Sequence, residues 1–313
     1  MVNRVIIKGA DHPMARRKKG KPSLLAIIVI IVIALFGVKE TGIIDIDNSQ
    51  LTNSMLDGEV YVHFIDVGQG SSTLIQQGES GILVDSGLSE YGDTVSDFIK
   101  SCGVKKLEYV IATHPHDDHI GSLPQVMEDF TVGEIIMPEL SEMNTPTTKV
   151  YERLLDYIIE NDITVNAAEF GDIYEMEDVS FQILGPVEQK KDLNDMSVIC
   201  KIYAGDSSFM LLGDAEKDEL SSVCEYNEAY KFSFDSDVIL MGHHGSSTSV
   251  CEEFLDMVDA DTAVISCGRN NSYNHPHREA LQYCKDNGME IVRTDIDGTI
   301  SYKCTVDGME RVA

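Results

Sequence analysis

The residues best suited to chemistry are histidines and aspartates, because seven of the nine histidines fall in three short motifs. In the first motif, THPHDDHIGS (113–122), His114 and His116 are two residues apart. In extended chain, two such side chains point the same way and can hold one metal ion. The adjacent Asp118 and His119 can turn toward a second ion. Imidazole and carboxylate suit zinc, manganese or iron, and the motif has no thiolate that would indicate a purely structural zinc site.

Two later motifs offer further ligands. In FMLLGDAE (209–216) an apolar strand candidate ends at a glycine, so Asp214 emerges where its carboxylate could bridge two cations. Taken alone, an aspartate at a strand end is more often a helix cap. In DVILMGHHGSS (237–247) another apolar strand candidate delivers His243 and His244 to a glycine-lined turn. A pair of histidines there indicates a ligand more strongly than a lone histidine, which would often be structural.

The elements that must position these motifs alternate along the chain. Apolar runs predict strands at 60–65, 72–76, 81–85, 107–112, 133–137, 179–184, 197–203, 207–212, 237–241, 262–266 and 298–306. Amphipathic segments predict helices at roughly 92–102, 119–129, 147–160, 215–227, 250–258 and 277–287. The strands come in clusters with helices interspersed, in two halves. This favours α/β layers with mixed sheets in one domain spanning 59–313.

The N-terminal region carries a separate signal. The run from Leu24 to Val38 contains no charge and follows the basic segment ARRKKGK. We expect 23–38 to be a transmembrane anchor, with 1–22 as a basic cytoplasmic tail and 39–58 as a linker on the outside. The protein would then be a single-pass protein of the cell membrane with its C-terminal domain outside. Because a span usually takes about 20 residues, a cleaved signal peptide and a secreted protein are the alternative.

The charge balance limits the class of partner. The chain has 24 Lys and Arg against 53 Asp and Glu, for a net charge of −29. Residues 1–22 carry seven basic side chains and one acid and sum to +6, which leaves −35 for the rest. Such a body repels polyanions, so an anionic substrate needs a local positive charge such as bound metal ions. The seven cysteines are scattered without a CxxC pair, which indicates neither a thiolate zinc site nor a disulfide framework.

The order of the motifs resembles a known family. HxHxDH, a later GD and a still later histidine after a strand resemble the metallo-β-lactamase fold, an α/β αββα sandwich with a one- or two-metal site. A closer resemblance, over about 59–308, is to the extracellular metallo-β-lactamase-like domain of ComEC-type DNA-internalisation proteins and to its stand-alone relatives, which include a phosphorylcholine esterase. The segments that carry it are FIDVGQGSSTLI (64–75), GILVDSG (81–87), THPHDDHIGS, LNDMSV (193–198), LLGDAE, MGHHGSSTS (241–249), ISCGRNNSYNHPH (265–277) and RTDIDGTISYKCTVDG (293–308).

The resemblance implies two divalent metal ions, zinc or alternatively manganese. The implied ligands form two sets that share Asp214 as a bridge: His114, His116 and Asp214 for one ion, and Asp118, His119, Asp214 and His244 for the other. Asp85 would orient a metal-binding histidine through its second ring nitrogen; a turn residue before Gly87 is the alternative. His243, which precedes a ligand, could donate a hydrogen bond to the substrate.

Two departures from the family pattern bear on the chemistry. The wider superfamily usually has a histidine between the strand pairs, where this chain has Asn194-Asp195-Met196-Ser197. That follows the ComEC-like pattern, leaves one metal under-coordinated with room for a phosphate oxygen, and counts against β-lactam or thioester hydrolysis. Ser71 stands where ComEC-like sequences commonly have aspartate, a change around the ligands and not in them.

A last histidine motif, NHPH, lies where such domains close over the active site. His275 and His277 could hold a phosphoryl group or protonate the leaving oxygen, and the neighbouring Tyr273 and Asn274 could share that role. Surface histidines beside Pro276 are an equal alternative.

These features predict a membrane-anchored extracellular hydrolase that cleaves a phosphodiester with a metal-activated hydroxide. Asp118 or Asp85 would guide the hydroxide, and His243, His275 or His277 would help the leaving group. The acidic body favours a small phosphodiester, such as a headgroup on a lipid or wall polymer. The alternatives are a ComEC-like nuclease acting on DNA outside the membrane, and a non-catalytic metal-binding interaction module.

Overall fold

The computed structural model describes residues 58–142, 144–306 and 308–313. The predicted tail, membrane anchor and nearly all of the predicted linker lie outside these residues. Within the described part, no helix has the length and apolar character needed to span a bilayer.

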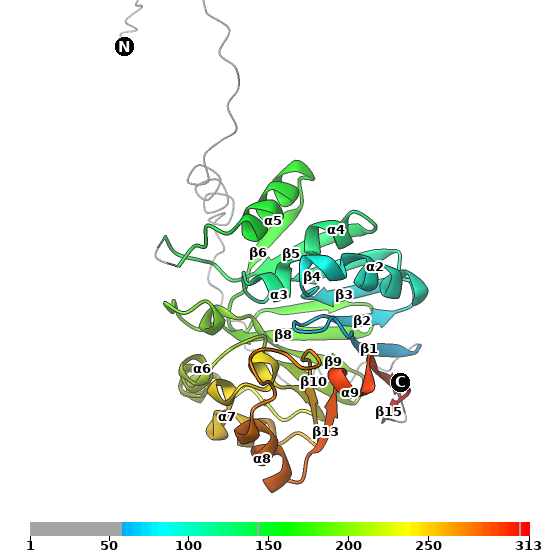
Figure 1. Ribbon diagram of the computed structural model, residues 1–313. Coiled ribbons are helices and arrows are strands. Elements are labelled where there is room, and N and C mark those ends of the chain that lie inside the picture. Colours follow the sequence, from blue (N-terminus) through cyan, green and yellow to red (C-terminus); the bar gives the residue numbers. More distant parts are fainter. Residues whose placement is uncertain (1–57, 143, 307) are drawn as a thin grey trace, which may run out of the picture. The chain divides into compact units, whose positions relative to one another are not determined.

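Two mixed sheets form the centre of the described domain (Figure 1). The first has eight strands among the described residues, in the spatial order β15 (Gly308–Arg311), β14 (Ile300–Thr305), β1 (Val60–Phe64), β2 (Thr73–Gln77), β3 (Ser80–Val84), β4 (Lys106–Ile111), β5 (Thr131–Met137) and β6 (Thr164–Ala167). Strands β15 to β3 pair antiparallel, and β3 to β6 pair parallel.

The second sheet repeats this mixed arrangement. Its seven described strands run in the order β13 (Glu290–Arg293), β12 (Thr262–Ile265), β11 (Val238–Leu240), β10 (Ser207–Leu211), β9 (Ile199–Ala204), β8 (Val179–Gly185) and β7 (Ile173–Met176). Strands β10 to β13 pair parallel, and β7 to β10 pair antiparallel. The carboxyl ends of parallel strands are where α/β folds bind ligands, and the predicted motifs follow β4, β10 and β11.

The apolar faces of the two sheets pack against each other. Alternate residues of β1, Val60, Val62 and Phe64, point into this core because side chains alternate between the faces of a strand. The ring of Phe64 lies 6.5 Å from that of Phe209 on β10, centre to centre, which joins the two sheets. Residues of both sheets belong to this one buried cluster.

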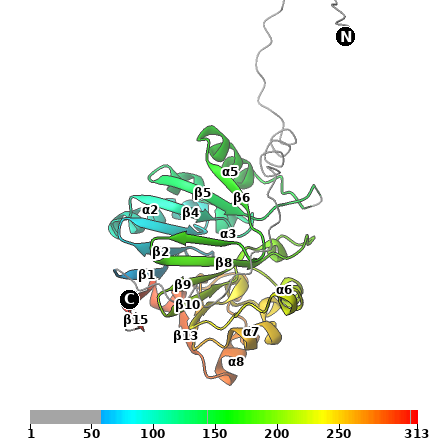
Figure 2. The ribbon, with the colours of Figure 1, turned by 180° about the vertical axis from the view of Figure 1, so that it is seen from behind.

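Helices cover the outer face of each sheet, which makes an αββα sandwich (Figure 2). The helices beside the first sheet are α2 (Gly92–Ser101), α3 (Asp117–Ile120), α4 (Leu123–Met127) and α5 (Lys149–Glu160). Those on the second are α6 (Lys217–Tyr230), α7 (Glu252–Val258) and α8 (Arg278–Asp286), whose apolar residues form a second buried cluster with the outer face of that sheet. The short α9 (Thr294–Asp297) precedes β14.

The single helix predicted at 119–129 is wrong, because the structure divides this segment into α3 and α4. Gly121 between them packs against backbone: a Cβ there would lie 2.6 Å from the amide nitrogen of Ser89 and 2.9 Å from the carbonyl oxygen of Gly87. The hydroxyl of Ser122 donates to the carbonyl oxygen of Ser86 at 2.6 Å. The break therefore holds the histidine loop against the segment that follows β3.

Candidate metal centre

The loop after β4 carries the first two histidines, and the first of them is buried. His114 is 1% exposed, and its Nδ1 lies 3.2 Å from the hydroxyl oxygen of Thr113 and 3.3 Å from that of Ser197. Its Nε2 lies 3.0 Å from Nδ1 of His116. His114 is thus held by hydroxyls on one side and presents its other nitrogen to the site.

His119 on α3 lies between two carboxylates. Its Nδ1 is 2.6 Å from Oδ2 of Asp85, and its Nε2 is 3.1 Å from Oδ1 of Asp214. Asp85 follows β3 with a φ of 58° and accepts hydrogen bonds from the amide and the hydroxyl of Thr113, at 2.9 and 2.7 Å. Asp85 is 1% exposed, so this carboxylate and His119 form a buried pair.

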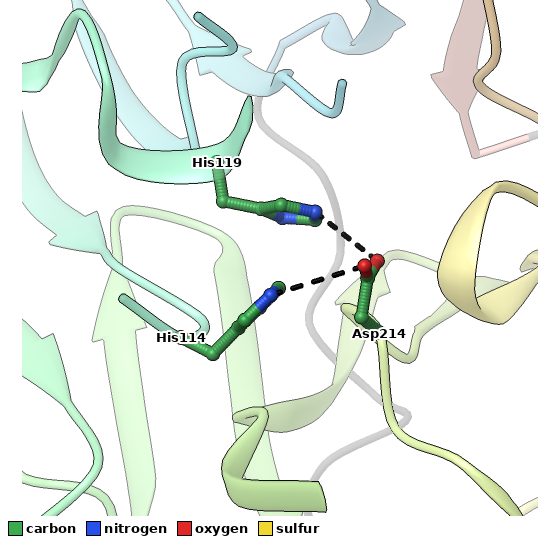
Figure 3. A group of neighbouring side chains, drawn as sticks. All are labelled: His114, His119 and Asp214. Carbon is green, nitrogen blue, oxygen red and sulfur yellow. Dashed lines mark ion pairs between the residues drawn. The ribbon is translucent and has the colours of Figure 1, made fainter. Parts of the chain in front are cut away.

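Asp214 is the residue on which the other side chains converge (Figure 3). It follows β10, and its backbone amide donates to the Ser197 hydroxyl at 2.9 Å. Its Oδ2 lies 3.8 Å from Nε2 of His114 and 3.6 Å from Nε2 of His244. Oδ2 also lies 3.7 Å from Nε2 of His243. With Oδ1 beside His119, the one carboxylate faces four imidazoles and is placed to act as a bridging ligand.

His243 and His244 follow β11 in a left-handed turn, with φ values of 48° and 55°. Nδ1 of His244 donates to the carbonyl oxygen of Ser266 at 3.0 Å, since that oxygen can only accept. Its Nε2 therefore carries a lone pair in the neutral ring, and it lies 3.3 Å from Oδ2 of Asp118. The turn fixes His244 in the tautomer of a metal ligand.

In this site the free ring nitrogens of neutral histidines face carboxylate oxygens, so hydrogen-bond acceptors face acceptors. A cation between them would satisfy both, which shows that the residues present fit a metal ion. His119 Nε2, Asp214 Oδ1 and His244 Nε2 are all buried without a hydrogen-bond partner among the described residues. In neutral rings, both nitrogens direct lone pairs at carboxylate oxygens, and a buried group without a partner costs about 1–3 kcal/mol. Two groups of side chains could each hold an ion, their candidate ligand atoms lying within 4.8 Å of one another: His114, His119 and Asp214; and Asp118, His119 and His244.

The protonation tendencies of the group agree with that fit. Burial would lower the pKa of His119, but Asp214 and Asp85 carry it well above its ordinary value. Burial would also lower the pKa of His244, but Asp214 raises that pKa above its ordinary value. Burial would raise the pKa of Asp214, yet His119 and His244 hold it well below its ordinary value. Without metal, protons on these side chains supply the positive charge that metal ions would otherwise supply. Protons and metal ions therefore compete for the same ligand atoms.

The structure brings together all six predicted ligands but changes their grouping. His119 rather than His116 completes the close set with His114 and Asp214. His116 instead lines the cleft above them, in contact with His114. The cleft has a volume of about 360 Å³, and its lining residues are Gln69, His116, Asp117, Asp118, Asn194, Asp214, His243, His244, Tyr273 and His275.

The two histidines of the NHPH motif lie in different surroundings, one inside the cleft and one outside it. His275 lies in the cleft, 8% exposed, with its ring 5.4 Å from that of His243 and Tyr273 stacked on it. Burial, together with His244 and His243, lowers the pKa of His275 to about 4. His277 does not line the cleft: its Nδ1 accepts from the amide of Ser247 at 3.0 Å, and its Nε2 lies 3.2 Å from the carbonyl oxygen of Tyr273.

Sequence reasoning missed two residues that hold the cleft walls. Glu216 lies 2.9 Å from Nδ1 of His243; its signal was a carboxylate two positions after Asp214 in LLGDAE. Asn271 accepts from the amide of His275 at 2.9 Å and donates to its carbonyl oxygen at 2.6 Å. Asn271 lies in an irregular loop and bonds backbone, so no sequence pattern marks it.

The αββα fold and its buried His/Asp groups define a metal-dependent hydrolase. The chain belongs to the metallo-beta-lactamase superfamily, whose family model matches residues 65–269. It is 31% identical over 269 residues to ComE operon protein 3 of Bacillus subtilis, covering 79% of this chain and 33% of the relative. It is 28% identical over 249 residues to competence protein ComA of Neisseria gonorrhoeae, covering 79% and 32%. These relatives are of the ComEC type, and the chain spans about a third of their length.

Solved structures show the same fold at low identity. CmlA, a diiron β-hydroxylase from Streptomyces venezuelae, is 14% identical with a TM-score of 0.52, over 82% of this chain and 55% of that one. Igni18, a metallo hydrolase from Ignicoccus hospitalis, is 15% identical with a TM-score of 0.50, over 77% and 98%. At these identities the likeness extends to the fold alone.

Proposed function

We propose that this chain is a phosphodiesterase that uses two divalent metal ions. The observation that carries the proposal is the pair of ligand groups that share His119 and open into one cleft. Among the described residues that line this cleft there is no Lys, Arg, Ser, Thr or Cys. The site thus offers no side-chain nucleophile of those types and no Lys or Arg, which favours water as the nucleophile and bound ions as the source of positive charge.

The metal set of the proposal combines the sequence motifs with the observed contacts. His114, Asp214 and His119 or His116 would hold one ion, and Asp118, His119, Asp214 and His244 the other. When bound, two such ions lower the pKa of water and stabilise the entering and leaving oxygens at phosphorus. Zinc suits the imidazoles, and manganese the carboxylates.

The remaining cleft residues act on the substrate and on the water. Asp118 is partly exposed at the cleft, where one oxygen can accept a proton from the attacking water. Asp85, being buried behind His119, orients that ring and does not reach the substrate. His243 and His275 line the same cleft with their ring centres 5.4 Å apart, and in this proposal they meet the leaving oxygen of the diester. His277 holds the loop that carries His275 in place.

Hydrolysis of bis(p-nitrophenyl) phosphate tests the proposal. Purified full-length protein in detergent, supplied with zinc or manganese, should release p-nitrophenolate, and His116→Ala with Asp214→Ala should lower the rate by at least about 100-fold. The exposed substitution Glu225→Gln is the control. A folded, metal-loaded protein that hydrolyses nitrocefin and no phosphodiester would overturn the proposal.

A nuclease is the second candidate, because relatives of the ComEC type match 79% of the chain. The charge of −35 outside residues 1–22 and the absence of Lys and Arg from the described cleft lining favour a small diester instead. Parallel assays with single-stranded DNA and with glycerophosphodiesters separate the two. Faster cleavage of DNA at physiological salt would favour the nuclease.

We further propose that 1–22 is a cytoplasmic tail, 23–38 a membrane anchor, 39–58 a linker and 59–313 an external hydrolase domain. The support is the uncharged run that follows a basic segment. Protease added to intact cells should release the hydrolase domain, and a domain protected until lysis would contradict this orientation.

A further inference from the structure

We propose that Tyr273 is a specificity-determining residue that stacks on a flat, unsaturated ring of the substrate. Such a ring is the nucleobase of a nucleotide ester or the aryl group of a small ester. The proposal rests on the phosphodiesterase function above and adds to it the kind of substituent that the diester carries. Tyr273 lines the cleft and is 60% exposed, more than any other aromatic side chain among the described residues.

Tyr273 differs in kind from the rest of the cleft lining. The other described residues that line the cleft have imidazole, carboxylate or amide side chains. Tyr273 therefore supplies the single phenol ring of this lining. Ligand pockets commonly combine a few polar groups that fix orientation with apolar or aromatic surface that holds the rest of the ligand. In this cleft the metal centre supplies the polar part, and the face of Tyr273 supplies the aromatic part.

Hydrogen bonds on both sides of Tyr273 hold its backbone in place. Oδ1 of Asn271 accepts from the amide of Tyr273 at 3.1 Å and from that of His275 at 2.9 Å. The carbonyl oxygen of Tyr273 accepts from Nε2 of His277 at 3.2 Å, since Nδ1 of that ring already accepts from the amide of Ser247. Because the backbone is fixed before a ligand arrives, binding on the ring costs little ordering of the loop.

One face of the Tyr273 ring is covered and the other is open. Its centre lies 5.6 Å from that of His275, and the two planes differ by 26°, which is a stacked arrangement. His275 is itself packed edge-on against His243 at 5.4 Å and against His277 at 4.7 Å. His275 thus supports the phenol ring from one side, and the largely exposed side chain leaves its other face to water. A flat ring of the substrate can extend this stack by one member.

The single free face favours a flat partner over a cation. Sites that recognise quaternary ammonium groups enclose the ion in a cage of several aromatic faces. Tyr273 offers one phenol face, and the ring stacked on it covers the second. Stacking on one exposed ring is instead the way in which proteins hold single flat groups such as unpaired bases.

Two phosphate monoesters, phenyl phosphate and cyclohexyl phosphate, test this role without turnover. Both carry a six-membered ring, but only the phenyl ring is flat and unsaturated. Calorimetric titration of the zinc-loaded full-length protein in detergent measures their Kd values. Tyr273→Leu keeps an apolar side chain but removes the ring, so it should raise the Kd of phenyl phosphate about 10-fold and that of cyclohexyl phosphate less than about 2-fold.

Two variants serve as controls. Tyr273→Phe keeps the ring and should leave both Kd values within about 2-fold of the wild type. Tyr230→Leu makes the same change as Tyr273→Leu at an exposed tyrosine of α6 that does not line the cleft, and it should alter neither value.

Thymidine 5′-monophosphate identifies the source of the flat ring. A larger loss of affinity for this nucleotide than for phenyl phosphate in Tyr273→Leu would assign the stack to a nucleobase. A smaller loss would assign it to an aryl group.

Inorganic phosphate separates stacking from a structural role. Its Kd and the bound zinc per chain should be equal in the wild type and Tyr273→Leu. Weaker binding of inorganic phosphate, or equal effects on phenyl and cyclohexyl phosphate, would overturn the stacking role. A loss for phosphocholine that exceeds the loss for phenyl phosphate would overturn it in favour of a cation. A zinc-loaded wild type that binds no phosphate compound would instead overturn the phosphodiesterase proposal, on which this one rests.

Discussion

Oδ2 of Asp85 lies 2.6 Å from Nδ1 of His119, and both side chains are at most 1% exposed. The same carboxylate accepts two hydrogen bonds from Thr113, one residue before the first histidine of the loop. Asp85 thus fixes the start of the histidine loop and the ring at its far end with one group. The ring of His119 is thereby held in one orientation, in which its Nε2 faces the carboxylate of Asp214.

Asp85→Asn should weaken metal binding without unfolding the protein. An amide can still accept from Thr113, but it cannot both do so and hold Nδ1–H of His119 as a carboxylate does. We expect the affinity for zinc to fall about 10–100-fold, the usual effect of removing the partner of a metal-binding histidine. Competition with a chromogenic chelator measures this, and Asp129→Asn, on the surface, is the control. Unchanged affinity would show that Thr113 alone positions the loop.

Metal binding should stabilise the fold, because the ions satisfy buried groups that otherwise have no partner. At a free metal concentration about 100 times Kd, the linkage amounts to about 2.7 kcal/mol. Calorimetry with and without EDTA should therefore show a Tm several degrees lower in the chelated sample. Asp214→Ala should abolish most of that difference, and an Asp214→Ala protein that still gains the full shift would place the ions elsewhere.

Glu219 should make stability fall as pH rises. Burial raises its pKa from 4.5 to about 8, although Val187 donates to its Oε1 at 2.7 Å and Lys190 lies 4.0 Å from its Oε2. A pKa raised in the folded state gives stability that is complete below about pH 4.5 and lost as pH rises toward 8. Glutamine stays neutral, so Glu219→Gln should gain roughly 2–4 kcal/mol relative to the wild type between pH 5 and pH 8.5.

Urea unfolding of both proteins across this pH range measures the difference. Glu228→Gln is the control for a change of net charge by one. A difference between Glu219→Gln and the wild type that stays constant with pH would contradict the raised pKa.

Gly70→Ala should disturb the site through the backbone. Gly70 has a φ of 155°, and a Cβ there would lie 2.5 Å from the carbonyl oxygen of Asp118. The Asp118 segment must move to relieve this contact, so we expect at least about a 10-fold loss of phosphodiesterase activity, in line with the sensitivity of active sites to displacements near 1 Å. Gly78→Ala is the matched control, because its φ is also positive, 58°, but nothing lies within 4 Å of the added Cβ. Equal effects of the two variants would assign the loss to backbone strain alone.

The strands could be predicted from the sequence where they are buried and not where they are exposed. All eleven inner strands among the described residues were predicted, whereas β6, β7, β13 and β15 were not, and these four are the edges of the two sheets. An edge strand pairs with one neighbouring strand and is short. The four edge strands also carry polar or half-exposed residues, such as Asn166 on β6, which donates to Glu134, and Glu310 on β15. The apolar signal that reveals a strand is therefore weakest at an edge.

The site shows a similar limit. The histidines and Asp214 were found because a metal centre needs particular atoms, and few residue types supply them. Their grouping depends on how two loops approach, so the sequence pointed to His116 where the structure has His119 beside His114 and Asp214. The position of His277 outside the cleft depends likewise on a bond to Ser247, thirty residues earlier in the chain.

Each candidate group draws its members from both halves of the sandwich. His114, Asp118 and His119 follow β4 of the first sheet, while Asp214 and His244 follow β10 and β11 of the second. Neither half can complete a group alone, so an ion binds fully only after the halves have docked. The centre thus couples metal binding to assembly: a chain in which the halves have not docked lacks a complete ligand group, so we expect hydrolytic activity only after docking.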